Sequence, residues 1–410
     1  MTNLSLSLSL YLSIVTALVT IPVLYQNAGW LLPTVAFIVV GIVSGCSASF
    51  VCEVLSDQSR RRPSHEKIEF GSLAESFFSR RWRIPLHVWL YLSLQTVNIA
   101  SIILSIQSMD RMLVSLAGRT CGVEFYPKFQ WTCVIAADMQ ETSMGASPFG
   151  SVYMLFTLGF LVTIGIVGPL GFLRLVDNAI VQIASIAALV IITIGWMVTF
   201  GQLGLSAERL PAVSSDGGQV VGTVLFNYAF ITTVPSWINS KQPSVSARKS
   251  IWWSIGVSTL LYILLGILGA MAIDLPKQGD ILSALEARLH DNMFIRISSY
   301  VFPIAVLITS IPVFTIVVRY NLVRGQLAGK VMANFLAGVL PWIVAIPFQS
   351  GDLLMTMMNW ASLFFNSAIN FILPFIMYLL YRRRSSFPAL SLRASSSSKF
   401  HGRCHLPSAP

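Results

Sequence analysis

The chain has 410 residues, of which 55% are hydrophobic and 11% are charged, and its mean hydropathy is +0.72. Soluble domains carry about 25% charged residues, so this composition excludes a soluble globular protein. The formal net charge of +10 raises the question of nucleic-acid binding. No basic stretch is interleaved with aromatic residues on a soluble segment, so the expected partner is the lipid bilayer and not nucleic acid.

Long apolar segments recur along the whole chain. An apolar helix of about 20 residues crosses a bilayer. One such helix could equally be the buried core of a soluble domain, but ten of them in one chain predict an all-α integral membrane protein. The ten predicted spans are 8–25, 31–51, 86–106, 151–171, 178–200, 219–237, 251–272, 297–318, 329–348 and 353–380.

The segments at the two ends of the chain are not expected to form a soluble domain. The N-terminal MTNLSLSLSLYLS has no basic residue and its apolar run continues to Pro22, which argues against a cleaved signal peptide. Residues 382–410 are basic and Ser-rich, and are expected to form a disordered cytosolic tail. Within the loop 52–85, the spacing of Leu73, Phe77, Phe78 and Trp82 is typical of an amphipathic helix that lies in the membrane interface. A plain connecting loop is the alternative.

The basic residues are distributed unevenly between the two sides. If the N-terminus is inside, the inner segments hold 20 of the 27 Lys and Arg residues. They lie mainly in the loop 52–85, after the sixth and eighth spans, and in the tail. This asymmetry predicts that both termini are cytosolic. The sequence leaves open whether the membrane is the plasma membrane or a vacuolar or lysosomal one.

The five cysteines and five histidines do not form a recognisable framework. Cys121 and Cys133 share the long outer loop, where the compartment permits a disulfide. Because the sequence gives no distance between them, a disulfide and two free thiols both remain open. The histidines lack metal-ligand spacing, so no metal site or cofactor is expected.

Two spans are interrupted by proline. The first, SIVTALVTIPVLYQNAGW, and the sixth, GTVLFNYAFITTVPSW, each contain Thr-x-Pro, at Pro22 and Pro235. Proline removes an N–H donor, and the backbone groups it frees inside lipid need protein, water or ligand as partners. Interrupted spans in matching places of two halves indicate a transporter binding site. A proline that only kinks a helix is the alternative.

Four stretches resemble the amino acid/auxin permease family. FNYAFITTVPSWINSKQPSVSARKSIW is similar to its sixth-helix region and LVTIPVLYQNAGW to the end of its first helix. ITSIPVFTIVVRYNL and NSAINFILPFIMYL resemble its eighth and tenth helices. The resemblance implies one amino acid transporter domain over 1–381, with a LeuT-type five-plus-five inverted repeat whose halves are about 8–200 and 219–381. It implies secondary active transport of amino acids by alternating access.

The chain departs from the family pattern in two places. Members usually show Gly-x-Gly before the first-helix proline, where this chain has Val15-Thr16-Ala17. They also typically have one span more, whereas no apolar run follows Tyr381. A non-transporting amino acid sensor and a truncated inactive member therefore remain alternatives. An enzyme would need clustered His, Asp or Cys residues and a channel would need a filter motif, and the sequence shows neither pattern.

The interrupted spans supply the expected substrate site. Helix N-termini can bind a substrate carboxylate, and unwound carbonyls can bind its ammonium. The expected substrate-binding residues are Thr16, Ala17, Leu18, Gln95, Asn98, Phe226, Asn227, Tyr228 and Ala229. For Gln95 and Asn98, hydrogen bonding between helices is the competing interpretation.

Thr309 and Ser310, which precede Pro312, are expected near a coupling ion. Sodium-coupled relatives share an Asn in the first helix, and this chain has Tyr11 at the position where that Asn would fall. Proton coupling or exchange is therefore expected in place of sodium coupling. His87 is the one weak proton-carrier candidate.

We predict that the loop 52–85 faces the cytosol and that 111–148 faces the opposite side, because basic loops are retained in the cytosol. Single cysteines placed in each loop of a cysteine-free variant are treated with a membrane-impermeant thiol reagent in intact cells. Labelling should occur in 111–148 before permeabilisation and in 52–85 only after it. The reverse pattern would contradict the topology.

Overall fold

The computed structural model describes residues 15–61, 67–126, 128–135, 147–149, 153–173, 179–214, 216–241, 245–275, 281–288, 292–349 and 353–386. Within this part of the chain, eight helices are long and apolar enough to cross a membrane, and α7 (Leu158–Gly171) is a shorter apolar helix. The eight are Leu31–Arg60, Arg80–Ala117, Gln182–Leu203, Val220–Ile238, Ala247–Ala272, Met293–Arg324, Lys330–Phe348 and Thr356–Arg384. The first predicted span lies partly outside the described residues.

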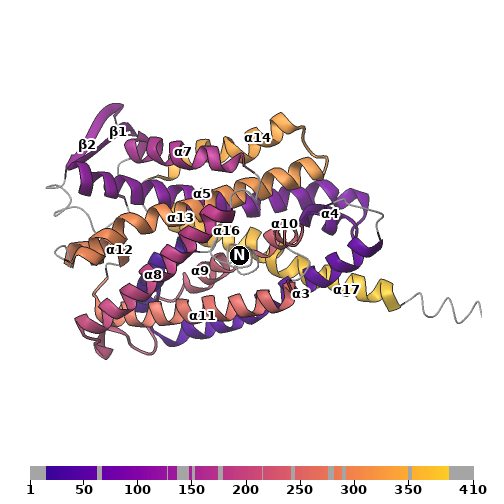
Figure 1. The fold of residues 1–410 in the computed structure, drawn as a ribbon, viewed down its shortest axis with the longest axis horizontal. Helices are drawn as coiled ribbons and strands as arrows, with labels where there is room; N and C mark the ends of the chain where they lie inside the picture. Colours follow the sequence, from indigo (N-terminus) through magenta and orange to yellow (C-terminus); the bar gives the residue numbers. More distant parts are fainter. Residues whose placement is uncertain are drawn as a thin grey trace, which may run out of the picture.

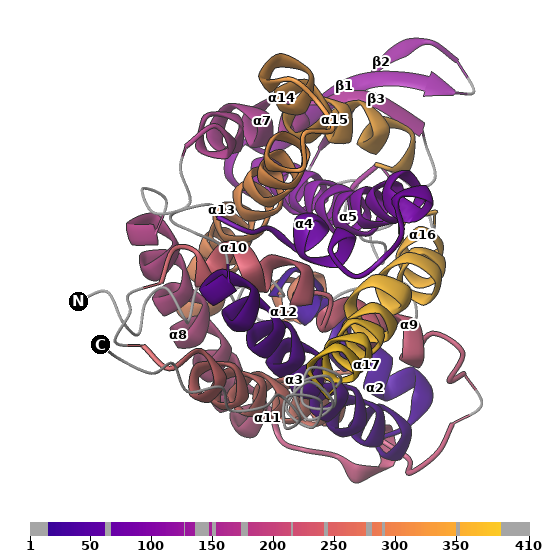
Figure 2. The same ribbon diagram turned by 90° about the vertical axis from the view of Figure 1, so that its right-hand side faces the viewer.

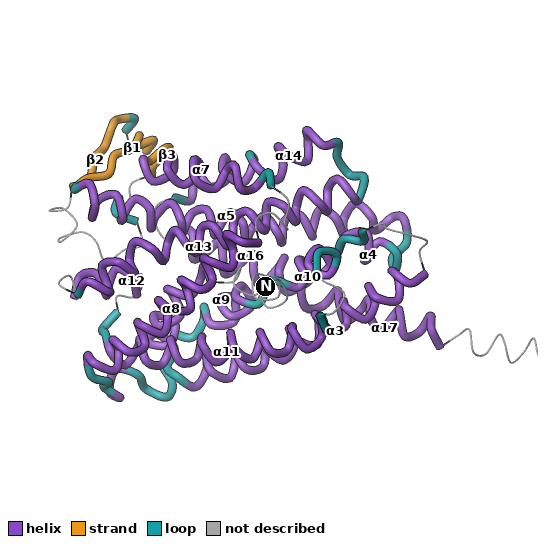
Figure 3. Tube along the Cα trace, viewed as in Figure 1, coloured by secondary structure: helices purple, strands orange, loops and turns teal. Residues whose placement is uncertain are grey.

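The chain is mainly helical, with one small sheet (Figure 3). The first half contains η1 (Val15–Thr20), α2 (Ile21–Ala28), α3 (Leu31–Arg61), α4 (Phe70–Glu75), η2 (Arg80–Trp82), α5 (Arg83–Ala117), β1 (Arg119–Tyr126), β2 (Gln130–Ile135), β3 (Tyr153–Thr157), α7 and α8 (Ala179–Leu203). The second half contains η3 (Ala207–Arg209), α9 (Val220–Asn227), η4 (Ile231–Thr233), α10 (Val234–Ile238), α11 (Ala247–Ala272), α12 (Ile281–Arg288), α13 (Met293–Arg324), α14 (Lys330–Gly338), α15 (Leu340–Ala345), η5 (Ile346–Phe348), α16 (Leu353–Ala361), the π-helix η6 (Ser362–Ile372) and α17 (Leu373–Ser386).

The long helices run along the long axis of the molecule (Figure 1). The end of α13 and the start of α14 lie at the same end of the bundle as α4 and α17, and the sheet lies at the opposite end. In the end-on view, α8 and α11 lie toward one side of the bundle and α7, α14 and the sheet toward the other, with α10 and α12 drawn between them (Figure 2). The helix ends next to the basic segments, which the charge pattern places on the cytosolic side, therefore lie at one end of the bundle. We call the end with α4 the inner end, following that prediction.

The burial of the helices separates centre from periphery. In α13 the most apolar window is 87% buried, whereas in α3 and α11 it is 39% buried. Between Leu31 and Ile42 the exposed residues of α3 are themselves apolar, among them Val35 and Val39. A helix that is apolar on its exposed face as well as its buried face suits a lipid environment. The outer helices therefore provide the lipid-facing surface of a multi-pass membrane protein.

The predicted span 151–171 is wrong at its start, because the segment Tyr153–Thr157 is strand β3. β3 pairs antiparallel with β1, which also pairs with β2, in the order β2-β1-β3. Thr157 ends the strand and caps α7, its hydroxyl accepting a hydrogen bond from the Phe160 N–H at 3.1 Å. The buried Asp110 of α5 holds this junction together by accepting from Thr157, from Thr120 and from the Gly159 N–H at 2.6, 2.8 and 2.8 Å. An apolar strand of this kind cannot be told from a helix by hydropathy.

The interfacial helix considered for the loop 52–85 does not form as one element. α4 ends at Glu75 and the short η2 begins at Arg80. Leu73 and Phe77 are buried within the bundle, whereas Trp82 is 53% exposed. The apolar face therefore packs on protein, and only its last residue is free to meet lipid.

Cys121 and Cys133 lie directly opposite each other on the antiparallel strands β1 and β2. Their Cα atoms are 4.0 Å apart and their sulfur atoms form a bond of 2.00 Å. This cross-strand position is one that sequence spacing does not reveal.

We predict that Cys121 and Cys133 are disulfide-bonded in the native membrane, because the sheet holds them as direct neighbours. Native membranes are blocked with a thiol reagent, reduced, and labelled with a second reagent of different mass. Both cysteines should carry the second label. Recovery of the first label on both would contradict the bond, and Cys46 serves as the free-thiol control.

Candidate substrate site at the interrupted spans

The first span changes helix type where its proline lies. The 3-10 helix η1 continues directly into α2, and Pro22 lies in the first turn of α2, where its missing N–H costs no helical hydrogen bond. The junction packs closely on α11: a Cβ at Gly266 would lie 2.4 Å from the Tyr25 ring, and one at Gly269 would lie 2.9 Å from Pro22. Larger residues at these two glycines would push the interrupted span away from α11.

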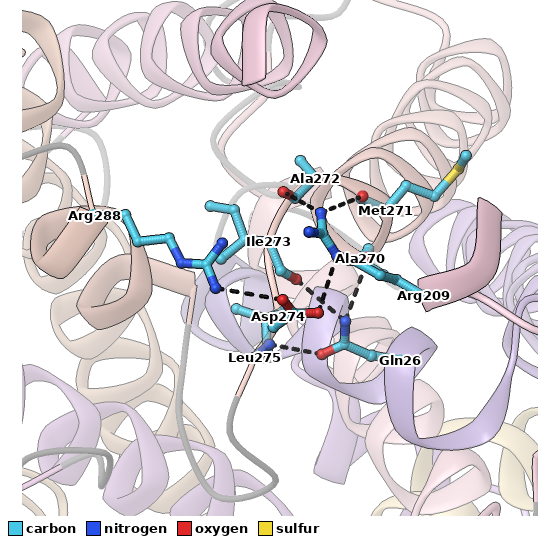
Figure 4. Close-up of polar contacts among 9 residues, drawn as sticks. All are labelled: Gln26, Arg209, Ala270, Met271, Ala272, Ile273, Asp274, Leu275 and Arg288. Carbon is cyan, nitrogen blue, oxygen red and sulfur yellow. Dashed lines mark hydrogen bonds and ion pairs between the residues drawn. The ribbon is translucent and has the colours of Figure 1, made fainter. Parts of the chain in front are cut away.

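A polar cluster fixes the outer end of the same span (Figure 4). The Gln26 amide donates to the carbonyls of Ala270 and Ile273 at 3.1 and 3.2 Å, and accepts from the Leu275 N–H at 2.7 Å. Gln26 therefore provides hydrogen-bond partners for the backbone at the end of α11, where no following helical turn is present to pair with the last carbonyls. Beside it, Asp274 forms ion pairs with Arg209 and Arg288 at 3.0 and 3.4 Å.

The sixth span is interrupted more completely. α9 ends at Asn227, the turn 228–230 follows, and the chain re-enters helix through η4 and α10. Pro235 lies in the first turn of α10. The interrupted segment is buried, with Phe226, Asn227, Tyr228 and Ala229 all at most 4% exposed. It therefore lies within the bundle and not against lipid.

Tyr228 ties the interrupted segment to α3 and α11. Its hydroxyl hydrogen-bonds to Thr259 and donates to the Phe37 carbonyl at 3.3 Å. Its ring lies 6.1 Å from that of Tyr262, and Phe37 lies 5.4 Å from Tyr262, in an aromatic group that also includes Tyr25 of the first span. Tyr228 thus links the interrupted parts of the first and sixth spans.

Several buried polar atoms around the interruption have no hydrogen-bond partner among the described residues. Asn227 donates to the Thr223 carbonyl at 2.9 Å, but its Oδ1 is unpartnered. The Thr232 and Ser362 hydroxyls and the Nδ2 atom of Asn366 are unpartnered as well. A buried polar atom without a partner costs about 1–3 kcal/mol, so a group of them indicates a place for water or ligand.

The π-helix of the tenth span braces the interruption. The Oδ1 atom of Asn370 accepts from the Thr232 N–H at 3.2 Å, so it partners a backbone donor that the broken helix leaves free. Asn370 donates to the Ser93 hydroxyl at 3.4 Å, and Ser93 donates to Asn366 at 2.6 Å. All four residues are at most 1% exposed. The sixth, tenth and third spans therefore share one buried hydrogen-bond network.

The structure separates the other expected site residues into two groups. η1, which contains Thr16, Ala17 and the buried Leu18, contacts α9 and α13. The side chains of Thr16 and Ala17 are outside the description. Gln95 lies elsewhere: it donates to the Leu336 carbonyl of α14 at 2.8 Å, and Asn98 lies 3.5 Å from both Gln95 and Thr315. The contacts of Gln95 and Asn98 are hydrogen bonds that connect helices. The third span is connected to the sixth through Ser93, which bonds to Asn370.

The expected ion-site residues lie in the buried helix α13. Ser310 donates to the Val306 carbonyl of its own helix at 2.9 Å. The side chain of Thr309 is outside the description, as is Tyr11. Among the described residues, no group of three or more His, Cys, Asp or Glu is placed to hold a metal ion.

Sequence reasoning missed Ser93, Asn366 and Asn370. A signal was present, because two Asn residues four apart in an apolar span lie on one helix face and both need partners. What the sequence could not show is which groups they pair with: Asn370 accepts from the backbone N–H of Thr232 in the sixth span, 138 residues away, and Asn366 accepts from Ser93 in the third.

The model of the transmembrane amino acid transporter protein family matches residues 2–397. The chain belongs to this family. It is therefore a multi-pass membrane protein from a family of amino acid transporters, as the resemblance implied. No curated protein matches the chain at a significant level.

We predict that Asn370→Leu destabilises the transporter by about 1–3 kcal/mol, because it leaves the Thr232 N–H buried without an acceptor. Thermal unfolding of the purified full chain in detergent should show a lower midpoint. Ser367→Ala in the same π-helix, at an exposed position, is the control. Equal midpoints for the two variants would contradict the bracing role.

Proposed function

We propose that this protein is a secondary active transporter of amino acids that works by alternating access around the interrupted first and sixth spans. The observation that carries the proposal is the buried interruption at 228–230, bordered by polar atoms that have no partner in the described part of the chain. A helix broken inside the hydrocarbon region is tolerated where the freed backbone faces protein or a cavity. Membership of the transporter family supports the same conclusion.

The LeuT-type five-plus-five architecture fits this arrangement. The two interrupted spans would be the first of each half, and Tyr228 and the contact of η1 with α9 bring them together. Pairs of interrupted spans at a repeat interface mark the substrate site in such transporters. The proposed halves are 8–200 and 219–381.

A neutral amino acid is the substrate that suits this site best. The segments α9, η4 and η6 contain no Asp, Glu, Lys or Arg. The carboxylate and ammonium groups would then be bound by backbone groups of η1 and of the turn 228–230, as first- and sixth-span residues were expected to do. Asn227, Thr232 and Asn366 would meet the substrate side chain through neutral hydrogen bonds.

Proton coupling or exchange is proposed in place of sodium coupling. The first-helix Asn of sodium-coupled relatives is replaced here by Tyr11, and the Ser310 hydroxyl is already bonded to its own helix. Substrate would move between the cytosol and the opposite side of a plasma, vacuolar or lysosomal membrane.

A sensor that binds amino acids without moving them is the second candidate. The observation that favours it is the unbroken passage from η1 into α2, since a 3-10 helix that continues into an α-helix leaves fewer free N–H groups for a carboxylate. Binding without flux distinguishes the sensor from the transporter.

Uptake of a panel of labelled amino acids into liposomes containing the purified chain, at two pH values with and without sodium, tests the proposal. We predict sodium-independent uptake of neutral amino acids, and that Asn227→Leu lowers it about tenfold through the loss of a hydrogen bond of about 1.5 kcal/mol. Insertion should be unaffected, because Leu suits lipid better than Asn. Binding by thermal shift without uptake would favour the sensor, and full uptake by Asn227→Leu would refute the site.

A further inference from the structure

A buried carboxylate lies at the inner end of the bundle, outside the spans. Glu69 directly precedes α4 and is 0% exposed, although the sequence places it in the charged loop 52–85. Its Oε1 atom forms an ion pair with Arg324, and its Oε2 atom accepts a hydrogen bond from Ser236. The Asn239 amide also donates to it, at 3.4 Å. Three donors from the second half of the chain therefore converge on one acid from the first half.

These contacts join three elements that a transport cycle would move apart. Ser236 follows Pro235 in α10, the inner half of the sixth span, and Arg324 ends α13. Asn239 donates in addition to the Ile68 carbonyl at 2.9 Å, and Asn321 of α13 accepts from the Gly71 N–H at 3.0 Å. The Glu69 side chain is the point at which α10, α13 and α4 meet.

A cavity opens beside this junction. Its volume is about 350 Å³, and it is lined by Ser72, Glu75, Ser76, Arg83, Arg324, Gly325 and Gln326. The Arg324 guanidinium, which lies 4.2 Å from the centre of the Tyr320 ring, borders both the cavity and Glu69. Solvent at the inner end is therefore separated from the Glu69 carboxylate by one side chain.

The charges facing Glu69 come from each neighbouring element. α13 provides Arg324, the charged side chain in contact with Glu69 among the described residues. At the start of α5, the charge of Arg83 is paired with Glu75 at 2.7 Å. Lys241 follows α10 and donates to the Val245 carbonyl at 2.9 Å. Burial raises the pKa of the Glu69 carboxyl above its usual value, although hydrogen bonds from Ser236 and the charge of Arg324 oppose this. A raised pKa means that Glu69 binds a proton at a higher pH than an exposed glutamate does.

We propose that Glu69 is a proton-binding site of the transport cycle, and that proton binding there releases α10 from α13 and α4. A hydronium ion in the cavity gives up one proton: one of its O–H bonds breaks, an O–H bond forms on a carboxylate oxygen of Glu69, and a neutral water and a neutral carboxyl group remain. Arg324 then loses its counter-ion and is drawn to solvent in the cavity, and Ser236 loses a charged acceptor. Loss of a proton restores the ion pair and closes the inner end again.

This inference rests on the proposed transport function and assigns a proton carrier at the inner end of the bundle. His87 is the competing carrier. It is buried, its Nδ1 atom lies 2.8 Å from the Arg83 carbonyl, and its Nε2 atom has no partner among the described residues. Unlike Glu69, it forms no hydrogen bond to α10 in the described contacts, so its titration would not act directly on the sixth span.

The test uses the purified full chain in liposomes with a pH difference of one unit and the amino acid most strongly taken up in the panel. One proton per substrate can sustain about tenfold accumulation. Glu69→Gln keeps the shape but not the charge, so accumulation should fall to about onefold while exchange of labelled for unlabelled substrate stays within about threefold of wild type. Asp274→Asn, an exposed Arg-paired acid at the outer end, and His87→Gln should retain proton-driven accumulation.

Undiminished accumulation by Glu69→Gln, or its loss in His87→Gln alone, would overturn the inference. If Glu69→Gln does not fold, Arg324→Gln decides: loss of the cation makes Glu69 bind protons more tightly, so the pH profile of uptake should move about one to three units upward. An unshifted profile would overturn the inference. Absence of exchange in wild type would refute the transport function instead.

Discussion

A backbone that leaves its helix inside a membrane must find partners for the hydrogen-bonding groups it frees, and the centre of this protein is organised around that requirement. The sixth span breaks at 228–230, where water is scarce. Asn370 of the tenth span partners the Thr232 N–H, and Tyr228 ties the same segment to α3 and α11. Without these partners the freed backbone groups would be left buried and unpaired, at a cost of several kcal/mol.

The same requirement explains why polar atoms are left over. A site that must hold a substrate for part of its cycle cannot have every donor and acceptor satisfied by protein. Asn227 and Thr232 keep unpartnered atoms beside the interruption, whereas Asp110 at the sheet junction has all its bonds within the protein. Fully partnered polar residues stabilise one structure, and partly partnered ones are suited to exchange partners.

The two ends of the bundle differ in how their charges are held. At the outer end, Asp274 is exposed and its ion pairs with Arg209 and Arg288 contribute little, because exposed pairs are screened by water. At the inner end, Glu69 is fully buried, and its ion pair with Arg324 exists only while the carboxyl group is ionised. Removing a charge from a buried pair changes the energy far more than removing one from an exposed pair. This difference is why we place the proposed proton-binding site at the inner end.

Composition, hydropathy and the two proline motifs are enough to predict a membrane bundle in which the sixth span is interrupted and the first changes helix type near its proline, because apolar length and proline act locally. The family follows from the same stretches. The start of α7 was misplaced because an apolar strand and an apolar helix have the same hydropathy. The pairing of Asn370 with Thr232 and of Glu69 with Ser236 and Arg324 joins residues far apart in the chain. No local pattern carries such contacts, since they arise only when separate helices pack and exclude water around them.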